Sequence, residues 1–130
     1  MVYNPAATAA GSTGWRGGEA PMSSGPTLQK KTFSYDEAAA LLPKVRRLTV
    51  EAYLEVAALS EKVGSEAQAR IDGVVTDWAR GLIEMGIEVK GLWLVDFDNG
   101  SGYYCWRYPE NGLHFFHSYD DGFRGRTRIQ

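Results

Sequence analysis

The sequence predicts an α+β fold in which an antiparallel helical hairpin packs on an antiparallel meander sheet of three or four strands. Two patterns carry this prediction. Between residues 33 and 86, apolar residues recur every three or four positions, which is the period of an amphipathic helix. From residue 87 onward the period falls to two, and clusters of Gly, Asn, Asp and Pro separate short runs, which is typical of strands joined by tight turns.

The first 31 residues are expected to form a flexible tail. They are rich in Gly, Ala, Ser, Thr and Pro and have no hydrophobic period, so burial cannot offset the entropy of ordering them. Met22 would serve equally well as a start of the chain, and Trp15 is the residue of the tail that could anchor on a partner. A single domain is therefore expected at residues 32–130.

The first helix is expected to begin at Ser34. Ser34 and Glu37 have the spacing of a capping box, and the preceding Phe33 can pack on the first turn as a hydrophobic staple. An apolar stripe then continues to Val63. Pro43 interrupts this stripe because it lacks a backbone N–H, so we expect a kink there, or a short helix followed by a long one.

The second helix is expected between two glycines. Gly64 is interpreted as the C-terminal cap of the first helix, and Ser65 with Gln68 has the spacing of a second capping box. An apolar stripe follows, and Gly86 closes the helix. Two amphipathic helices joined by a tight turn predict a hairpin.

Strands are expected at residues 87–90, 92–97, 103–108 and 113–118. The alternating faces are Leu92, Leu94 and Asp96 against Trp93, Val95 and Phe97; Tyr103, Cys105 and Arg107 against Tyr104, Trp106 and Tyr108; and Leu113, Phe115 and His117 against His114, Phe116 and Ser118. Neither face is cleanly polar. We therefore expect the helices to cover one face, and the tail or another subunit to cover the other.

Composition excludes several functional classes. No apolar run approaches the roughly 20 residues that cross a bilayer, so no membrane association is expected. The net charge is −2 and no segment is strongly basic, so nucleic acid is not the expected partner. The chain has a single cysteine, Cys105, and no secretion signal, which favours the reducing cytoplasm.

A candidate ligand site lies on or just beyond adjacent strands. Its members are Asp96, Arg107, His114, His117, Asp120 and Asp121. Asp96 and His117 are the candidate ligands of a divalent metal, and Arg107 and Asp120 are further candidate ligand-binding residues. However, His114 and His117 would point to opposite faces of a regular strand. The simpler interpretation is a cross-strand ion pair between Asp96 and Arg107, with His117 hydrogen-bonded at the end of the sheet. No cofactor is predicted, and a divalent metal is kept as the alternative.

Other chemistry-bearing residues favour structural roles. Asp96, Asp98, Asp120 and Asp121 would suit an acid–base enzyme or a hard cation, but Asp before Gly is also what tight turns require. Cys105 lies in mid-strand between aromatic residues, which is the setting of a small buried hydrophobe. The sequence therefore singles out no catalytic residue, and a non-enzymatic role is favoured.

Aromatic residues concentrate in the sheet region: ten of the sixteen follow Ile87. An excess of Trp and Tyr on a sheet is also the composition of interface centres. The candidate interaction residues are Trp93, Tyr104, Trp106, Tyr108, Phe116, Phe123, Arg124 and Arg126. Arg124, Arg126 and Arg128 alternate near aromatic rings and would lie on one side of a strand, a mixture suited to single-stranded RNA or to an acidic protein surface.

Several separated motifs, in order, resemble the DUF2203 family of small bacterial or archaeal proteins. They are the capped FSYDEAAALLP helix, the VDF of residues 95–97, the CWR of residues 105–107, and His117 followed by GFRGR at residues 122–126. The resemblance runs from about Phe33 to Ile129. Relatives often have an acidic residue or Gly after His117, where this chain has Ser118, so a carboxylate role at that position is doubtful. The resemblance implies a helical hairpin with a small sheet, and no established activity.

The function expected from these observations is that of a non-catalytic interaction or accessory protein, which self-associates or joins a larger protein assembly. The alternative is a metal- or small-ligand-binding domain, with or without enzymatic activity, centred on Asp96, Arg107 and His117. The third hypothesis is that the protein binds single-stranded RNA.

Overall fold

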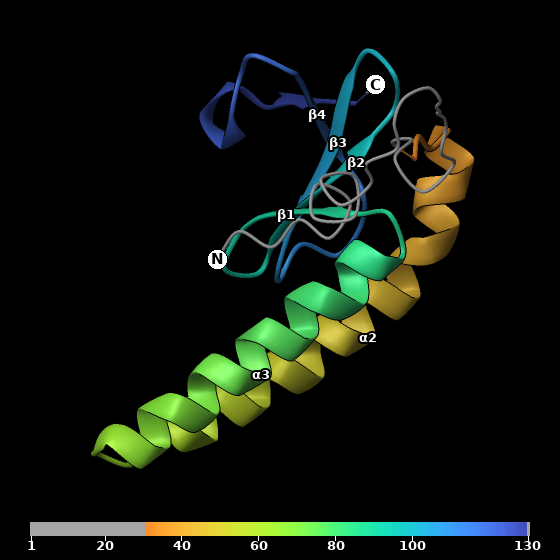
Figure 1. Ribbon diagram of the computed structural model, residues 1–130. Helices are drawn as coiled ribbons and strands as arrows, with labels where there is room; N and C mark the ends of the chain where they lie inside the picture. The colour runs from red at the N-terminus through yellow and green to blue at the C-terminus, as the bar shows by residue number, and fades with distance from the viewer. Residues whose placement is uncertain (1–30, 130) are drawn as a thin grey trace, which may run out of the picture. The chain divides into compact units, whose positions relative to one another are not determined.

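The computed structural model describes residues 31–129, which form a helical hairpin and an antiparallel sheet (Figure 1). The predicted α+β class is confirmed. The elements are α2 (Tyr35–Leu59), α3 (Ser65–Glu84), β1 (Glu88–Gly91), β2 (Leu94–Asp98), β3 (Gly102–Arg107), β4 (Phe115–Ser118), the 3-10 helix η3 (Phe123–Gly125) and β5 (Thr127–Arg128). The predictions for Trp15, Met22 and the rest of residues 1–30 lie outside the described residues.

Helix α2 begins with the predicted capping box. The N–H of Glu37 donates to Ser34 Oγ at 3.1 Å, and the N–H of Ser34 donates to Glu37 Oε1 at 2.9 Å. The helix then runs through Pro43 as one element of 25 residues, so the predicted alternative of a short and a long helix is wrong. It ends at Leu59, before the predicted cap at Gly64.

Helix α3 begins differently from the prediction. Gly64 is its N-cap, with a φ of 114°, and no side chain caps the first turn. Ser65 is already helical, and the Gln68 side chain donates to Asp72 Oδ1 at 3.0 Å, so the second capping box is wrong. The other end is as predicted: Gly86, with a φ of 87°, follows the last helical residues and reverses the chain.

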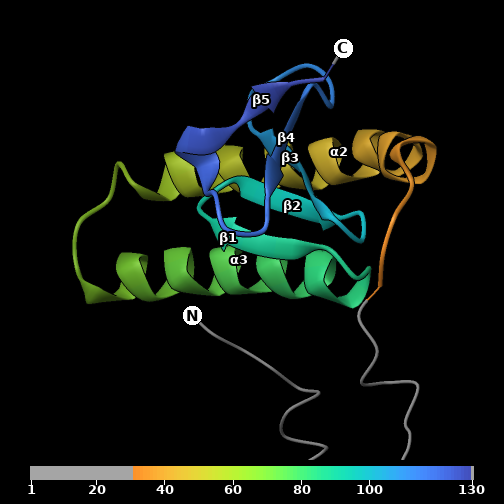
Figure 2. The same cartoon turned by 90° about the horizontal axis from the view of Figure 1, so that it is seen from above.

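The five strands form a meander in the order β1-β2-β3-β4-β5, and each neighbouring pair is antiparallel. The fifth strand was not predicted, because Thr127 and Arg128 are too few to show a period. Seen from above, the two helices run side by side along the sheet (Figure 2), and the end that carries the α2–α3 turn extends past it (Figure 1).

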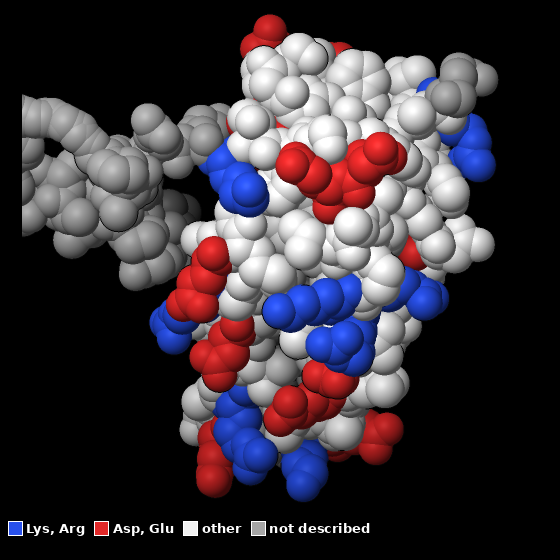
Figure 3. All heavy atoms as spheres, turned by 90° about the vertical axis from the view of Figure 1, so that its right-hand side faces the viewer, with Lys and Arg blue, Asp and Glu red and all other residues white. Residues whose placement is uncertain are grey.

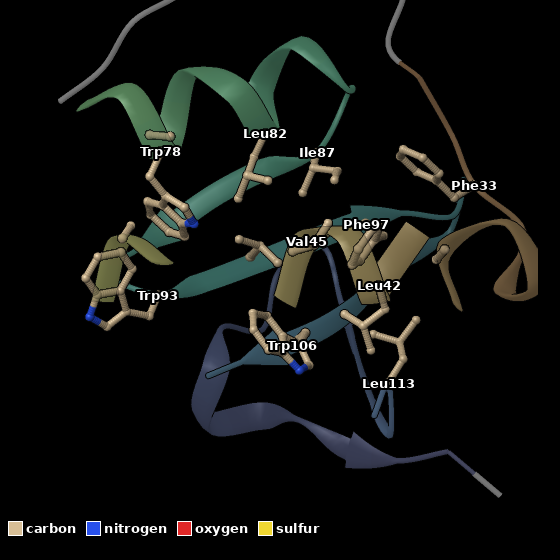
Figure 4. Packing of buried hydrophobic residues seen from close by; sticks show 14 residues of the cluster. Phe33, Leu42, Val45, Trp78, Leu82, Ile87, Trp93, Phe97, Trp106 and Leu113 are labelled. Carbon is tan, nitrogen blue, oxygen red and sulfur yellow. The ribbon is translucent and has the colours of Figure 1, made fainter. Parts of the chain in front are cut away.

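The hairpin covers one face of the sheet and builds the core there (Figure 4). Its buried side chains include Leu42 and Val45 of α2, Trp78 and Leu82 of α3, and Val95, Phe97 and Trp106 of the sheet. Phe33 packs edge-on against Phe97 with ring centroids 5.4 Å apart. This face therefore provides the core, and the second face of the sheet carries different side chains.

The second face of the sheet is not the apolar surface that was expected. At its centre lie Asp96, Asp98, Tyr103, Cys105 and His117, which are all less than 10 % exposed. We call this the polar face. Side chains of residues 119–128, the C-terminal segment, reach over it: the Tyr119 hydroxyl donates to Asp98 Oδ1 at 2.7 Å, for example. The chain itself therefore covers much of the face that was assigned to the tail or another subunit.

Candidate metal centre

Three neighbouring strands each contribute one side chain to a buried cluster on the polar face. Asp96 of β2 lies opposite Cys105 of β3, and His117 of β4 lies opposite Tyr103, two residues before Cys105. Residues opposite one another, and residues two apart on a strand, share a face. One potential ligand atom from each of Asp96, Cys105 and His117 therefore lies within 4.8 Å of the others.

The two ring nitrogens of His117 have different partners. Nδ1 lies 2.8 Å from the carbonyl oxygen of Ser118, so Nδ1 carries a proton and donates it. Nε2 lies 3.0 Å from Oδ2 of Asp96. In the neutral ring, Nε2 is then an acceptor that faces another acceptor. A proton on the ring or on the carboxyl group, or a metal ion between the two atoms, is needed to make this contact favourable.

The Asp96 carboxylate has one engaged and one unengaged oxygen. Oδ2 contacts His117 and lies 3.3 Å from Nζ of Lys90. Oδ1 is buried and has no hydrogen-bond partner among the described residues. Burying a charged oxygen without a partner is costly, so this atom has an unused capacity to bind a cation.

Lys90 lies between the buried cluster and solvent. Its ammonium group lies 4.0 Å from the ring centroid of Tyr103 and 3.5 Å from Glu88 Oε1, and its side chain is 36 % exposed. Burial opposes the charged form, but the negative charge of Asp96, with that of Glu88, outweighs it and raises the pKa of Lys90. Lys90 is therefore a cation beside the buried carboxylate.

The Cys105 thiol is protonated in this environment. Burial, followed by the charge of Asp96, raises the pKa of Cys105 to about 12, and Arg126 offsets only part of this. A neutral, buried thiol is not a nucleophile. A metal ion that binds sulfur displaces the thiol proton, so the same residue can still be a ligand.

Arg126 of the C-terminal segment closes the cluster from above. Its guanidinium lies 3.9 Å from the ring centroid of Phe115 and 4.1 Å from that of Phe123. Nη2 forms an ion pair with Glu110 Oε2 at 2.8 Å, and Nη1 reaches the Cys105 sulfur at 3.9 Å. The segment thus shields the sulfur of Cys105 from solvent.

The predicted ion pair between Asp96 and Arg107 is wrong. The register places Arg107 opposite Leu94, and Arg107 is exposed. Its guanidinium lies 5.4 Å from the ring centroid of Phe123, while Asp96 contacts His117 and Lys90. The sequence pattern identified the right face for Arg107 but not its position along the strand.

The other predicted ligand candidates lie away from the cluster. His114 precedes β4, and its Nε2 lies 3.1 Å from Asn111 Oδ1. Asp120 and Asp121 are exposed, beyond the end of β4. Asp98 is buried but accepts from the Gly100 N–H at 2.9 Å, as expected of an Asp in a turn.

The predicted interaction residues do not form one exposed surface. Trp93 and Trp106 are buried; Tyr104, Tyr108, Phe123 and Arg126 are half-buried; Phe116 and Arg124 are exposed. Residues 123–125 form a 3-10 helix, so the three arginines near the C-terminus do not alternate along one strand as expected. On the face shown in Figure 3, Lys and Arg are interspersed with Asp and Glu, unlike the single-sign surface of nucleic-acid binders.

Sequence reasoning missed the participation of Cys105 and Lys90. Alternation had already placed Asp96, Cys105 and His117 each on one face of its own strand. The missing information was the register, which makes those three faces the same face of the sheet.

The comparisons with known proteins agree with this fold and these motifs. Residues 31–129 match the model of a family described as an uncharacterized conserved protein, DUF2203. No curated protein and no solved structure matches the chain. Neither helix of the described region combines the length and the apolar content of a membrane span. Because the family match covers the helical hairpin and the whole sheet, the chain belongs to the DUF2203 family, as its motifs suggested.

Proposed function

We propose that this protein binds a divalent transition metal ion, zinc or one of similar preference, through Asp96, Cys105 and His117. A set of one sulfur, one nitrogen and one oxygen ligand is typical of such ions. Around a tetrahedral zinc ion, ligand atoms of these types lie about 3.3 to 3.6 Å apart. The potential ligand atoms, all within 4.8 Å of one another, need only small adjustments to reach those separations.

The observation that carries the proposal is the contact between His117 Nε2 and Asp96 Oδ2 at 3.0 Å. The bond from Nδ1 to the Ser118 carbonyl selects the tautomer whose Nε2 lone pair faces the carboxylate. Metal-binding histidines are commonly oriented by such a bond from the other ring nitrogen. The unpartnered Oδ1 and the adjacent thiol favour a metal ion over a proton as the shared cation.

Metal binding would also neutralise the negative charge of the buried cluster. The ion would neutralise Asp96 and replace the proton of Cys105, and three protein ligands would leave a fourth position open. The thiol must stay reduced for this role, which supports the cytoplasm as the proposed location.

Cobalt(II) titration of the chelator-treated protein tests the proposal. The expected result is a saturable thiolate-to-cobalt absorption band together with tetrahedral visible bands. Cys105→Ala should abolish the thiolate band, with folding checked by circular dichroism. His114→Ala, which changes the histidine outside the cluster, should leave the spectrum unchanged. Absence of the thiolate band in the wild type would overturn the metal centre.

Nitrogen-15 NMR of the histidine rings separates the metal from a second proton. Saturating zinc should leave Nδ1 of His117 protonated and convert Nε2 to a metal-bound nitrogen, while the signals of His114 stay unchanged. If Nε2 of His117 remained protonated in saturating zinc, the shared cation would be a proton and the proposal would be wrong.

Self-association is a second proposal, favoured by the exposed side chains of Tyr53 and Leu92. Tyr53 is 40 % exposed, and its ring centroid lies 5.0 Å from that of Tyr108 and 6.1 Å from that of Trp93. The adjacent Leu92 is 57 % exposed. Light scattering after size exclusion should show a dimer that Leu92→Lys dissociates and Val63→Lys does not. A monomer at every concentration of the wild type would contradict this proposal.

A further inference from the structure

We infer that the fourth position of the metal centre takes an oxygen of a small oxyanion, a carboxylate or a phosphate, which Lys90 holds by its charge. The inference rests on the proposed metal centre. It adds to that centre a class of ligand and a residue that selects it.

Lys90 lies close enough to reach a ligand on the metal. Its Nζ is 3.3 Å from Oδ2 of Asp96. A metal ion bound to that oxygen at about 2.0–2.2 Å lies no more than roughly 5.5 Å from Nζ. An oxygen in the fourth position, about 2 Å from the ion on the side that faces Lys90, is then within reach of the ammonium group.

The charge of Lys90 favours an anion once the metal is bound. Without metal, Asp96 is the buried carboxylate that forms an ion pair with Lys90 at 3.3 Å. When a metal ion binds that carboxylate, Lys90 keeps its contacts with the Tyr103 ring, 4.0 Å from the ammonium group, and with Glu88, which also accepts from the Tyr103 hydroxyl at 3.1 Å. Asp96 and the Cys105 thiolate balance the two charges of the metal ion, so the ammonium group of Lys90 is the charge that favours an anion over water in the fourth position.

Lys90 is better placed for this role than the other cation near the cluster. Arg126 already binds both carboxylate oxygens of Glu110, at 3.1 and 2.8 Å, and is wedged between two aromatic rings. Lys90, in contrast, is 36 % exposed and stands where the buried cluster meets solvent. A small ligand that enters from solvent on this side therefore passes the ammonium group before it reaches the metal.

The test uses the full-length cobalt(II)-loaded protein and follows its visible spectrum during titration with sodium acetate and, separately, with inorganic phosphate. At least one anion should change the tetrahedral bands to saturation while the thiolate band persists. A response to acetate alone assigns a carboxylate ligand, and a response to phosphate alone assigns a phosphate ligand.

Variants at position 90 test the role of the charge. Lys90→Met, which keeps the length of the side chain, should weaken anion binding by about tenfold, and Lys90→Arg should restore most of it. Lys62→Met removes an exposed lysine beyond the end of α2 and should have no effect.

Two results would overturn the inference while leaving the metal centre intact. One is a persistent thiolate band with no response to either anion, which would mean that water fills the fourth position. The other is equal anion affinity in Lys90→Met and the wild type. Loss of the thiolate band in the wild type would remove the metal centre and this inference together.

Discussion

At the scale of single residues, Trp93 shows how burial can hold a residue against its backbone preference. It lies in the turn between β1 and β2 with a φ of 62°, a conformation that favours glycine. Its ring packs against Trp78, with centroids 4.8 Å apart, and is only 8 % exposed. The burial of a large aromatic ring outweighs the left-handed backbone, which costs roughly 1–2 kcal/mol.

The strained backbone at Trp93 predicts that glycine is a more stable replacement there than alanine. Trp93→Ala should lose about 3–5 kcal/mol of unfolding free energy, because the ring is removed and the strained backbone keeps a Cβ. Trp93→Gly should be about 1 kcal/mol more stable than Trp93→Ala, because glycine relieves the strain. Urea denaturation measures both. As a control, Lys44→Gly within α2 should be less stable than Lys44→Ala by about 1 kcal/mol. Equal or better stability of Trp93→Ala would show that the turn is not strained.

At the scale of elements, α2 is stable despite an internal proline. Pro43 lies inside the helix and is exposed, so it removes one backbone hydrogen bond without adding a core contact. The buried residues on either side of it, Leu42 and Val45, keep the helix docked on the sheet. Packing therefore outweighs local propensity in this helix.

Replacing this proline should stabilise the protein. Pro43→Ala is expected to raise the free energy of unfolding by about 1–2 kcal/mol, since the regained hydrogen bond exceeds the added entropy of the unfolded chain. Thermal and urea unfolding give the value. Arg47→Ala, an exposed change one turn later, should stay within about 0.5 kcal/mol of the wild type. A less stable Pro43→Ala would indicate that the proline ring itself packs.

The C-terminal segment is a second element whose anchoring can be tested. Glu110 accepts from both guanidinium nitrogens of Arg126 and, at 2.9 Å, from the N–H of Arg107. Glu110→Gln removes the charge from these bonds and should cost about 1–3 kcal/mol of local stability. Hydrogen exchange should speed up at residues 123–128 and not in α3. Glu61→Gln, an exposed change after α2, is the control, and unchanged exchange in Glu110→Gln would show that the ion pair does not hold the segment.

At the scale of the whole molecule, the proposed metal would link three strands that are separate in the sequence. Asp96, Cys105 and His117 belong to β2, β3 and β4, and the core on the other face joins β2 and β3 to both helices. Loss of any of the three strands would remove the site, so metal binding and global folding should be coupled.

Zinc at a hundredfold excess over its dissociation constant should therefore raise the unfolding free energy by about 2.7 kcal/mol. A chelator should reverse the gain, and Cys105→Ala should show much less of it. Denaturant titration with and without zinc gives both values. Identical curves for the wild type would contradict the link between metal and fold.

The sequence by itself determined the features that act within a few residues. The capping box of Ser34 and Glu37, the end of α3 at Gly86 and the change of period after it were all readable, because caps, turns and alternation depend on near neighbours. Together they were sufficient for the α+β class and the antiparallel meander. They were not sufficient for the start of α3, where a positive-φ glycine replaced the expected serine cap.

The tertiary structure alone decided which residues meet on the polar face. Register brought Asp96, Cys105 and His117 together and left Arg107 exposed, and side chains of the C-terminal segment reached over the face that had been assigned to another subunit. These outcomes depend on contacts between residues far apart in the chain, and a shift of two residues in register keeps every side chain on its face while changing all of its neighbours.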